Sequence, residues 1–302
     1  MNDRFTAADV PDQSGKTFLI TGANTGLGLE IARVLARQGA RVLLGCRSMS
    51  KAEAAVAALR SELPDADLDI VSIDLGDLAS VRAAAERVAQ EPRLDGLINN
   101  AGIMMPPREL TKDGFESQFG VNHLGTFALT GLLLPKLQET PGSRIVNTAS
   151  NAHKTGKMDL DDVNAEQSYS ALGRYCMSKL ANLLHVFELN RRLQARNSTT
   201  LAVTAHPGFS DTELARHLPG WMTMFIPAMR LMMNTAAQGA WPTLMAATDP
   251  DVEGGQYFGP RGLGELAGPA RRVESKPLSK DPVLAKGLWD RSVEMTGVDP
   301  EL

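Results

Sequence analysis

The chain has 302 residues, of which 43% are hydrophobic and 22% are charged, and its formal net charge is −4. This composition is ordinary for a soluble globular protein, and the absence of a basic block argues against nucleic acid or an anionic membrane as the main partner. The two cysteines, Cys46 and Cys176, argue against a disulfide scaffold and fit a reducing cytoplasm, where we expect the protein to reside.

Residues 1–15 are predicted to form a flexible polar arm, which lacks the apolar core of a secretory signal. From residue 16 onward, short apolar runs alternate with stretches of helical character. The runs predict strands at 16–20, 40–45, 69–73, 94–98, 144–149, 200–205 and 255–258. The stretches between and after them predict helices at 29–38, 50–61, 77–90, 114–137, 169–195, 235–247 and 281–296, the last with Ser279 as its cap and Gly297 as its stop.

Strands that alternate with helices are typical of a parallel sheet covered on both faces. No internal repeat and no linker divides the chain. We therefore expect a single α/β domain over residues 16–302, a Rossmann-type doubly wound parallel sheet of about seven strands with helices on both faces. It would include an apolar segment at 208–233 and a Gly- and Pro-rich tail that begins at residue 260.

A glycine-rich turn, TGANTGLG at 21–28, lies between the first predicted strand and the first predicted helix. Glycines let the backbone turn tightly and approach a pyrophosphate, whose charge the free amides at the start of a helix can meet. Glycines also serve plain turns, and it is the position between strand and helix that favours a dinucleotide site.

The end of the second predicted strand reads Cys46-Arg47-Ser48 and carries no acidic residue, which an NAD site would use to bind the ribose hydroxyls. A guanidinium matches the geometry of a phosphate, so Arg47 favours NADP(H) over NAD. The alternative is a solvated arginine at the start of a helix. Asp74 and Leu75 follow the third strand, at the carboxyl edge of the sheet where ligands collect in such folds.

Tyr175 and Lys179 lie four residues apart in the predicted helix 169–195, so they share one face. A phenol is a poor acid–base catalyst at neutral pH because its pKa is about 10. A nearby ammonium favours the phenolate and lowers that pKa. For an isolated pair, a core tyrosine with a solvated lysine is the alternative interpretation.

Taken in order, these motifs resemble the short-chain dehydrogenase/reductase family, and within it the retinol-dehydrogenase-like and protochlorophyllide-reductase-like branch. The resemblance covers residues from about 16 to about 258. The matching pieces are 21–28, Cys46-Arg47, Asp74-Leu75, 99–102, Val121-Asn-His-Leu-Gly125, Ser150, 175–179 and His206-Pro-Gly-Phe-Ser-Asp-Thr212. The long spacing between Ser150 and Tyr175 also resembles that branch.

The resemblance implies four catalytic residues. Tyr175 would be the general acid in carbonyl reduction and the base in alcohol oxidation, and Ser150 would hold the substrate oxygen. Lys179 would activate the tyrosine and bind the nicotinamide ribose, and Asn122 would bend its helix and hold a water in a proton relay. The residues implied to bind the dinucleotide are Gly22, Asn24, Thr25, Gly26, Leu27, Gly28, Arg47, Ser48, Asp74, Leu75, Asn99, Ala101, Gly102, Tyr175, Lys179, Pro207, Gly208 and Thr212.

In such a protein, the segment 208–233 would close over the substrate, and its methionines and aromatic residues favour a lipophilic carbonyl or alcohol. Packing onto the domain, or contact with another subunit, is the alternative. Its longest apolar stretch, residues 221–233, contains Pro227 and Arg230 and is too short to span a bilayer. The family also implies a homodimer or homotetramer built through helices 114–137 and 169–195, and the five histidines lack the spacing of a metal site.

The sequence thus favours an NADP(H)-dependent oxidoreductase that interconverts an alcohol and an aldehyde or ketone. Two rival functions remain: a catalytically idle NADP-binding regulatory or scaffold protein, and a light-driven reductase of a double bond. An epimerase or dehydratase is a third, but such relatives carry a larger sugar-nucleotide domain than this tail can form.

Overall fold

The computed structural model describes residues 3–209 and 234–302. Within these ranges eight strands form one sheet in the order β3-β2-β1-β4-β5-β6-β7-β8, and all neighbours are parallel except β7 and β8. The strands are β1 (Thr17–Thr21), β2 (Arg41–Cys46), β3 (Leu68–Ser72), β4 (Gly96–Asn99), β5 (Arg144–Thr148), β6 (Leu201–Ala205), β7 (Tyr257–Pro260) and β8 (Ala270–Val273). The expected single doubly wound α/β domain is confirmed, with one strand more than the sequence predicted.

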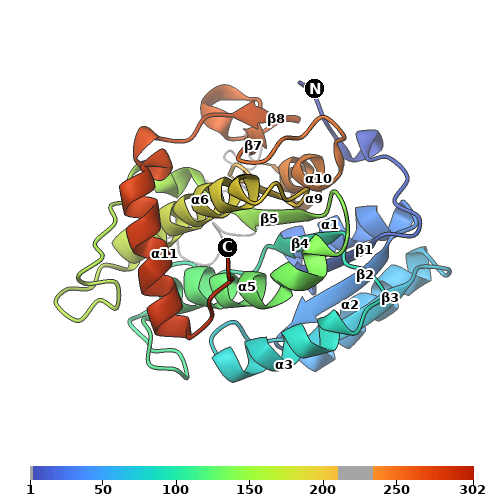
Figure 1. Ribbon diagram of the computed structural model, residues 1–302. Helices are drawn as coiled ribbons and strands as arrows, with labels where there is room; N and C mark the ends of the chain where they lie inside the picture. Colours follow the sequence, from blue (N-terminus) through green and yellow to red (C-terminus); the bar gives the residue numbers. More distant parts are fainter. Residues whose placement is uncertain (1–2, 210–233) are drawn as a thin grey trace, which may run out of the picture.

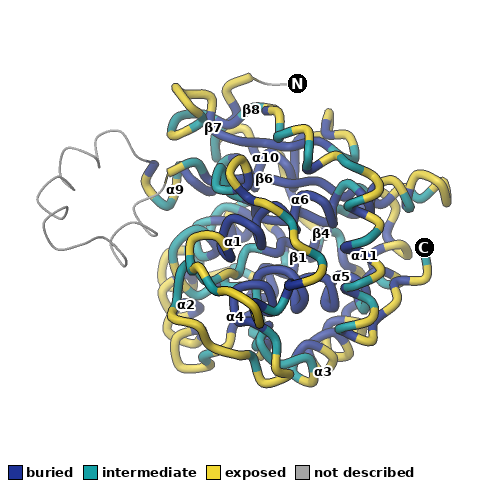
Figure 2. The backbone as a smooth tube through the Cα atoms, turned by 90° about the vertical axis from the view of Figure 1, so that its left-hand side faces the viewer, coloured by how far each residue is buried: buried dark blue, intermediate teal, exposed yellow. Residues whose placement is uncertain are grey.

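Helices cover both faces of the sheet (Figure 1). One core cluster joins the sheet to α1 (Gly26–Arg37), α2 (Met49–Glu62) and α10 (Trp241–Thr248). A second joins the opposite face to α3 (Leu78–Ala89), α5 (Gly125–Gln138) and α6 (Ala171–Ala195). In Figure 2, where buried residues are dark blue, the central strands and most of α6 are buried. Such strands read as continuous apolar runs because both of their faces are covered.

β8 lies in the Gly- and Pro-rich tail, where no strand was predicted, and it pairs antiparallel with β7. The N-terminal segment joins the same edge: Phe5 N donates to Ala270 O at 3.1 Å, and Ala270 N donates to Phe5 O at 2.8 Å. Phe5 and Val10 are both buried. Phe5 and Val10 therefore pack the N-terminal segment against the domain. This corrects the expectation of a flexible arm.

The helix predicted at 114–137 is interrupted. It consists of α4 (Ser117–Phe119), a π-helical turn at Gly120–Leu124 and α5, with Asn122 in the π-helical turn. The helix predicted at 235–247 is likewise split into α9 (Ala236–Gly239) and α10.

The last helix, α11 (Pro282–Thr296), is capped by Asp281 rather than by Ser279. The Asp281 carboxylate accepts hydrogen bonds from Val283 N and Leu284 N. As predicted, α11 ends at Gly297, whose φ of 60° suits glycine.

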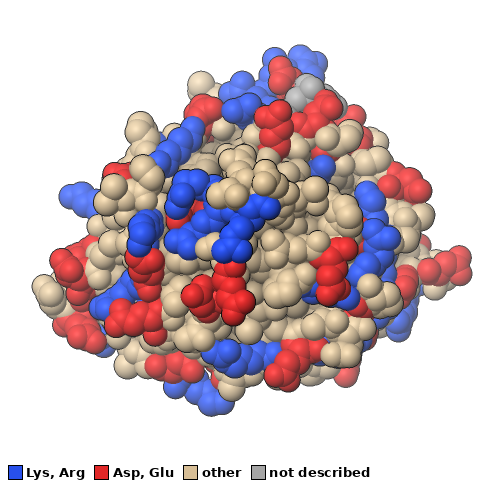
Figure 3. Space-filling view, viewed as in Figure 1, with Lys and Arg blue, Asp and Glu red and all other residues tan. Residues whose placement is uncertain are grey.

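The surface that faces the viewer in Figure 3 carries acidic and basic side chains interspersed rather than a field of one sign. In the described part of the chain, every helix is too short or too polar to cross a lipid bilayer. The apolar segment predicted at 208–233 lies outside the described residues except for Gly208 and Phe209.

Candidate active site

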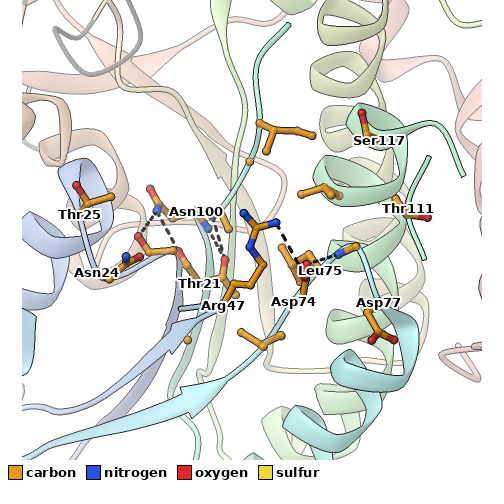
Figure 4. Close-up of a pocket in the computed structure, with 18 of the residues that line it drawn as sticks. Thr21, Asn24, Thr25, Arg47, Asp74, Leu75, Asp77, Asn100, Thr111 and Ser117 are labelled. Carbon is orange, nitrogen blue, oxygen red and sulfur yellow. Dashed lines mark hydrogen bonds and ion pairs between the residues drawn. The ribbon is translucent and has the colours of Figure 1, made fainter. Parts of the chain in front are cut away.

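A cavity of about 690 Å³ opens at the carboxyl ends of β1, β2, β3 and β4 (Figure 4). This is where the strand order reverses direction, the position at which doubly wound sheets bind ligands. Ten of the residues implied to bind the dinucleotide line it: Gly22, Asn24, Thr25, Gly26, Leu27, Arg47, Asp74, Leu75, Ala101 and Gly102. The rest of the wall includes Thr21, Asn100 and the loop residues Glu109, Leu110, Thr111 and Lys112, which the sequence did not single out.

The glycine turn between β1 and α1 is built for close backbone approach. Gly22 and Gly26 have φ of +67° and +56°, in the left-handed region that favours glycine. A Cβ atom placed on Gly28 would lie 2.3 Å from Gly22 O and 2.6 Å from Asn100 Nδ2, so only a hydrogen fits there. Gly28 thus supports the turn from behind and does not line the cavity.

The first turn of α1 presents open donors to this cavity. Its N-terminal cap, Thr25, forms no side-chain hydrogen bond to the helix amides. Amides at a helix start that no side chain caps are a ready site for an anion, and the helix dipole adds to the attraction. The turn, its amides and the size of the cavity therefore fit a dinucleotide pyrophosphate.

Thr21 and Asn100 brace the turn against the loop after β4. The amides of Asn100 and Ala101 both donate to Thr21 Oγ1 at 3.0 Å, and Asn100 Nδ2 donates to Thr21 O at 3.0 Å. Asn99, which was expected under the ribose, instead donates from Nδ2 to Asn147 Oδ1 at 2.7 Å and to Thr130 Oγ1 at 3.0 Å. Its amide lies in the core, because successive residues of an extended chain point to opposite sides.

Arg47 lies at the mouth of the cavity and leans towards Asp74 (Figure 4), with Arg47 Nη1 3.9 Å from Asp74 Oδ2. The Arg47 side chain is 77% exposed, so this ion pair is weak and can yield to a phosphate. Asp74 is held by Gly76 N, which donates to its Oδ1 at 2.9 Å. Ser48 is the N-terminal cap residue of α2 and does not line the cavity; its hydroxyl lies 3.2 Å from that of Ser50.

Three of the four expected catalytic residues meet beside the loop after β4. Lys179 Nζ lies 5.7 Å from the ring centroid of Tyr175 and donates to Thr148 O at 3.3 Å. Both side chains are buried. A Cβ atom placed on Gly102 would lie 3.1 Å from Asn122 Oδ1 and 3.5 Å from Lys179 Nζ, so the lysine and the asparagine share one edge of the cavity.

Asn122 locks the π-helical turn to the loop after β4. Its Oδ1 accepts from Ile103 N at 2.8 Å, and its Nδ2 donates to Ile103 O at 2.9 Å and to Ser178 Oγ at 3.0 Å. The bend in the helix that was expected at Asn122 is present. All the polar atoms of this side chain are engaged in holding backbone and a neighbouring hydroxyl.

Ser150 follows β5 and caps a short turn, Asn151–Lys154, in which its Oγ accepts from Ala152 N at 3.2 Å. The segment after it packs on α6 beside Tyr175: Thr155 Oγ1 donates to Cys176 Sγ at 3.3 Å. A Cβ atom placed on Gly156 would lie 2.5 Å from Cys176 O. The fourth expected catalytic residue therefore belongs to a turn in direct contact with the helix that carries Tyr175.

A buried histidine holds this turn from the other side. His153 Nδ1 lies 2.6 Å from Ser150 O, and Lys276 N donates to His153 Nε2 at 3.3 Å. The backbone amide can only donate, so the ring proton lies on Nδ1 and is donated to Ser150 O. Burial lowers the pKa of His153 to about 4, so the ring is neutral at physiological pH.

Pro207 and Gly208 follow β6, and a Cβ atom placed on Gly239 would lie 3.5 Å from Pro207 Cβ and 2.7 Å from Leu27 Cδ2 of the glycine turn. Gly208 has φ of +74°, and a Cβ atom there would lie 2.3 Å from Leu266 O, so this position requires glycine. Thr212, which was expected to flank the nicotinamide carboxamide, lies outside the described residues. Across 3–209 and 234–302, no three His, Cys, Asp or Glu side chains gather closely enough to hold a metal ion.

Comparison with known proteins agrees with this geometry. Residues 16–222 match the family model described as short chain dehydrogenase. Mouse retinol dehydrogenase 14 is 43% identical over 300 residues, which cover 94% of this chain and 86% of that protein. Human retinol dehydrogenase 13 is 40% identical over 311 residues, covering 99% of this chain and 91% of that protein.

Solved structures share the fold. An uncharacterized protein from Mycobacterium paratuberculosis aligns with a TM-score of 0.84 and 42% identity, covering 99% of this chain and 100% of that one. A short chain dehydrogenase from Burkholderia cenocepacia in complex with NADP aligns with a TM-score of 0.63 and 26% identity, covering 82% and 96% of the two chains. The protein described here belongs to the short-chain dehydrogenase/reductase family, and within that family it is retinol-dehydrogenase-like.

Proposed function

We propose that the protein is an NADP(H)-dependent oxidoreductase that interconverts an alcohol and an aldehyde or ketone, with Tyr175 as the general acid and base. One observation carries the proposal: Lys179, Asn122 and Gly102 converge at the edge of a cavity whose glycine turn fits a pyrophosphate. The retinol dehydrogenases that the chain resembles support a substrate of the alcohol and carbonyl class.

The described residues divide the binding of the dinucleotide among them. The glycine turn and the first amides of α1 would hold the pyrophosphate, and Asp74 and Leu75 would border the adenine. Arg47 would meet the 2′-phosphate, since a guanidinium suits a phosphate and no acidic residue competes for the ribose at the end of β2. When bound, the nicotinamide supplies or accepts the hydride.

The chain's own residues would manage the proton. During reduction, the Ser150 hydroxyl donates a hydrogen bond to the substrate oxygen and Tyr175 transfers its phenolic proton to that oxygen. The Lys179 ammonium, 5.7 Å from the phenol ring, stabilises the phenolate that remains until solvent returns a proton. In alcohol oxidation the same phenolate accepts the alcohol proton.

A lipophilic substrate fits this proposal best. Phe209, at the start of the apolar segment 208–233, is 39% exposed beside the Pro207–Gly208 turn. An apolar wall next to a few convergent polar groups is typical of a site for a small hydrophobic molecule.

Consumption of NADPH against a graded panel of aliphatic, aromatic and isoprenoid aldehydes and ketones, with NADH in parallel, tests the proposal. We expect turnover that rises with chain length, and Tyr175→Phe should lower kcat about 10²–10⁴-fold because the proton donor is lost. Binding of NADPH, followed by its fluorescence, should remain. NADPH binding with no turnover on any carbonyl, or turnover unchanged by Tyr175→Phe, would favour the idle scaffold instead.

A further inference from the structure

A loop of the C-terminal tail, residues 262–268, lies between two turns of the candidate site. Asn151 Nδ2, in the turn that Ser150 caps, lies 3.3 Å from Gly264 O and 3.4 Å from Glu265 O and donates to both. On the other side, Phe209 N donates to Leu266 O at 2.8 Å. The same short loop therefore contacts the segment after β5 and the segment after β6.

The carboxylate of Glu265 spans these two segments. Its Oε2 lies 3.1 Å from Lys154 Nζ and 3.2 Å from His206 Nε2. Lys154 ends the turn that Ser150 begins, and His206 directly precedes Pro207. Burial alone would raise the pKa of Glu265, but His206 and Lys154 lower it to about 2, so the group is a carboxylate at neutral pH.

His206 links Glu265 to the backbone of Gly208. Gly208 N donates to His206 Nδ1 at 3.2 Å, so the neutral ring carries its proton on Nε2, which faces Glu265. The ring is completely buried. A Cβ atom placed on Gly259 would lie 2.0 Å from His206 Nε2, so glycine at 259 leaves the space that the ring occupies.

The backbone of Glu265 is an independent sign that this residue type is required. Its φ is +58°, in the left-handed region that a glutamate adopts only at a cost. Such a conformation persists where the surroundings hold it in place, and it is concentrated at functional sites. Turn geometry alone would favour glycine or asparagine here, whereas the two contacts above need a charged carboxylate.

We propose that Glu265 is a positioning residue that holds the Ser150 turn and the Pro207–Gly208 turn in register, through Lys154 on one side and His206 on the other. The inference rests on the proposed function, in which these turns hold the substrate oxygen and the nicotinamide carboxamide. Small displacements between such groups are expensive, because reacting atoms must meet in a narrow range of geometry.

Two variants and one matched control test the proposal. Glu265→Gln removes the charge and keeps the shape of the side chain, while Lys154→Met removes one partner only. Glu274→Gln is the control, because Glu274 forms an exposed ion pair with Lys280 at 2.6 Å in the same tail. Hydrogen exchange of peptides covering 150–156 and 206–209 is measured on the full chain. The kcat and the KM for NADPH are measured on the same variants, and both experiments are run well below the unfolding temperature.

We expect Glu265→Gln to speed exchange in both segments and to lower kcat about tenfold, with a smaller change in the KM for NADPH. Lys154→Met should speed exchange in 150–156 alone, and Glu274→Gln should change neither segment. Equal exchange in Glu265→Gln and the wild type, an equal rise in the control, or an unchanged kcat would overturn the inference. A wild type without any carbonyl turnover would overturn the proposed function, while the exchange data would still show whether Glu265 holds the two turns.

Discussion

The proposed preference for NADP(H) depends on one exposed side chain, that of Arg47. It follows β2 directly, where an acidic residue would bind the ribose of NAD, and its only described charged partner is Asp74 at 3.9 Å. An exposed ion pair at that distance is worth about 0–1 kcal/mol. A charge-assisted hydrogen bond to a phosphate is worth about 1.5–3 kcal/mol, so the phosphate would win the competition.

Arg47→Ala should therefore raise the KM for NADPH about tenfold or more and leave that for NADH nearly unchanged, because only the former carries a 2′-phosphate. Initial rates with the two dinucleotides at saturating carbonyl substrate measure the effect. Lys51→Ala is the matched control, since Lys51 is a nearby exposed cation of α2 that does not line the cavity. An equal rise for both dinucleotides would remove Arg47 as the discriminating residue.

The adjacent residues Asn99 and Asn100 show the limit of sequence reasoning at this scale. The motif 99–102 correctly predicted a loop at the cavity, because small polar residues after a strand suit close backbone approach. Which of the two side-chain amides faces the cavity depends on the backbone twist at the end of β4, and the sequence alone does not determine that twist. Asn99 bonds to Thr130 and Asn147 in the core, and Asn100 lines the cavity instead.

Among the elements, the π-helical turn at Gly120–Leu124 couples packing to the site. Its Asn122 satisfies both backbone polar groups of Ile103 and also donates to Ser178. Buried polar groups that lose their partners cost about 1–3 kcal/mol each. Hydrogen bonds from Asn122 to the loop that borders the cavity therefore help to stabilise the irregular geometry of this turn.

Asn122→Ala should lower the free energy of unfolding by about 1–3 kcal/mol, since Ile103 is left unsatisfied, and should also lower kcat because Lys179 loses its neighbour. Denaturant unfolding and steady-state kinetics measure the two effects. Asn164→Ala is a matched control: Asn164 likewise clamps a loop, accepting from Glu116 N at 2.6 Å, but it does not line the cavity. It should lose stability and keep its kcat; a loss of kcat in both variants would make the effect of Asn122 purely structural.

Buried histidines make the packing of the helices sensitive to acid. His123 of the π-helical turn and His185 of α6 lie with their rings 5.8 Å apart, next to Phe127. Burial lowers the pKa of His185 to about 3 and holds the pKa of His123 well below its usual value. Both rings are therefore neutral in the folded protein and take up a proton only on unfolding, once the pH falls below about 6.5.

Stability should consequently fall as the pH is lowered from about 6.5 to 5, by about 1.4 kcal/mol per pH unit for each such histidine, because the unfolded state then binds more protons. His185→Phe should reduce that slope by about the contribution of one histidine. Free energies of unfolding in denaturant at several pH values measure the slope. Carboxylates have lower pKa values than histidines and contribute less to the slope in this pH range. If the slope of stability against pH were unchanged in His185→Phe, the acid sensitivity would belong to groups other than His185.

Strands such as β1 and β2 could be predicted from the sequence because they are buried on both faces and their apolar runs are nearly continuous. β8 reads ARRV and has no such run; its pairing with β7 comes from the packing of the tail and not from local preference. Phe5 was likewise hidden in a polar segment, since its partner, Ala270, lies at the other end of the chain. The role inferred for Glu265 depends on the same tail and was invisible for the same reason.

At the scale of the whole molecule, α11 lies across α6 and α5 (Figure 1). Its Trp289 ring lies 5.1 Å from that of Phe127 and 5.9 Å from that of His185, and the Arg192 guanidinium lies 4.3 Å from its centroid. The sequence predicted assembly through helices 114–137 and 169–195, and this stays a prediction. The part of their surface that α11 covers is already occupied within one chain.

Trp289→Ala should lower the free energy of unfolding by about 3–5 kcal/mol, because it leaves a cavity between three helices and removes the stacking with Arg192. Val283→Ala on the same helix is the control; Val283 is 81% exposed, and its loss should change stability by less than about 0.5 kcal/mol. Denaturant melts of the two variants and the wild type decide the matter. If Trp289→Ala lowered the free energy of unfolding no more than Val283→Ala does, the packing of Trp289 would contribute little to stability.

The position of α11 also has a consequence for the synthesis of the protein. The ribosome makes α5 and α6 long before this helix, and because a domain generally folds as a unit, their packing cannot be completed until α11 has been added. Until α11 emerges, the apolar surroundings of His123, Phe127 and His185 stand open to water and to other nascent chains. A chaperone that shields apolar surface would be needed most during this interval, and newly made chains would be most vulnerable to aggregation then.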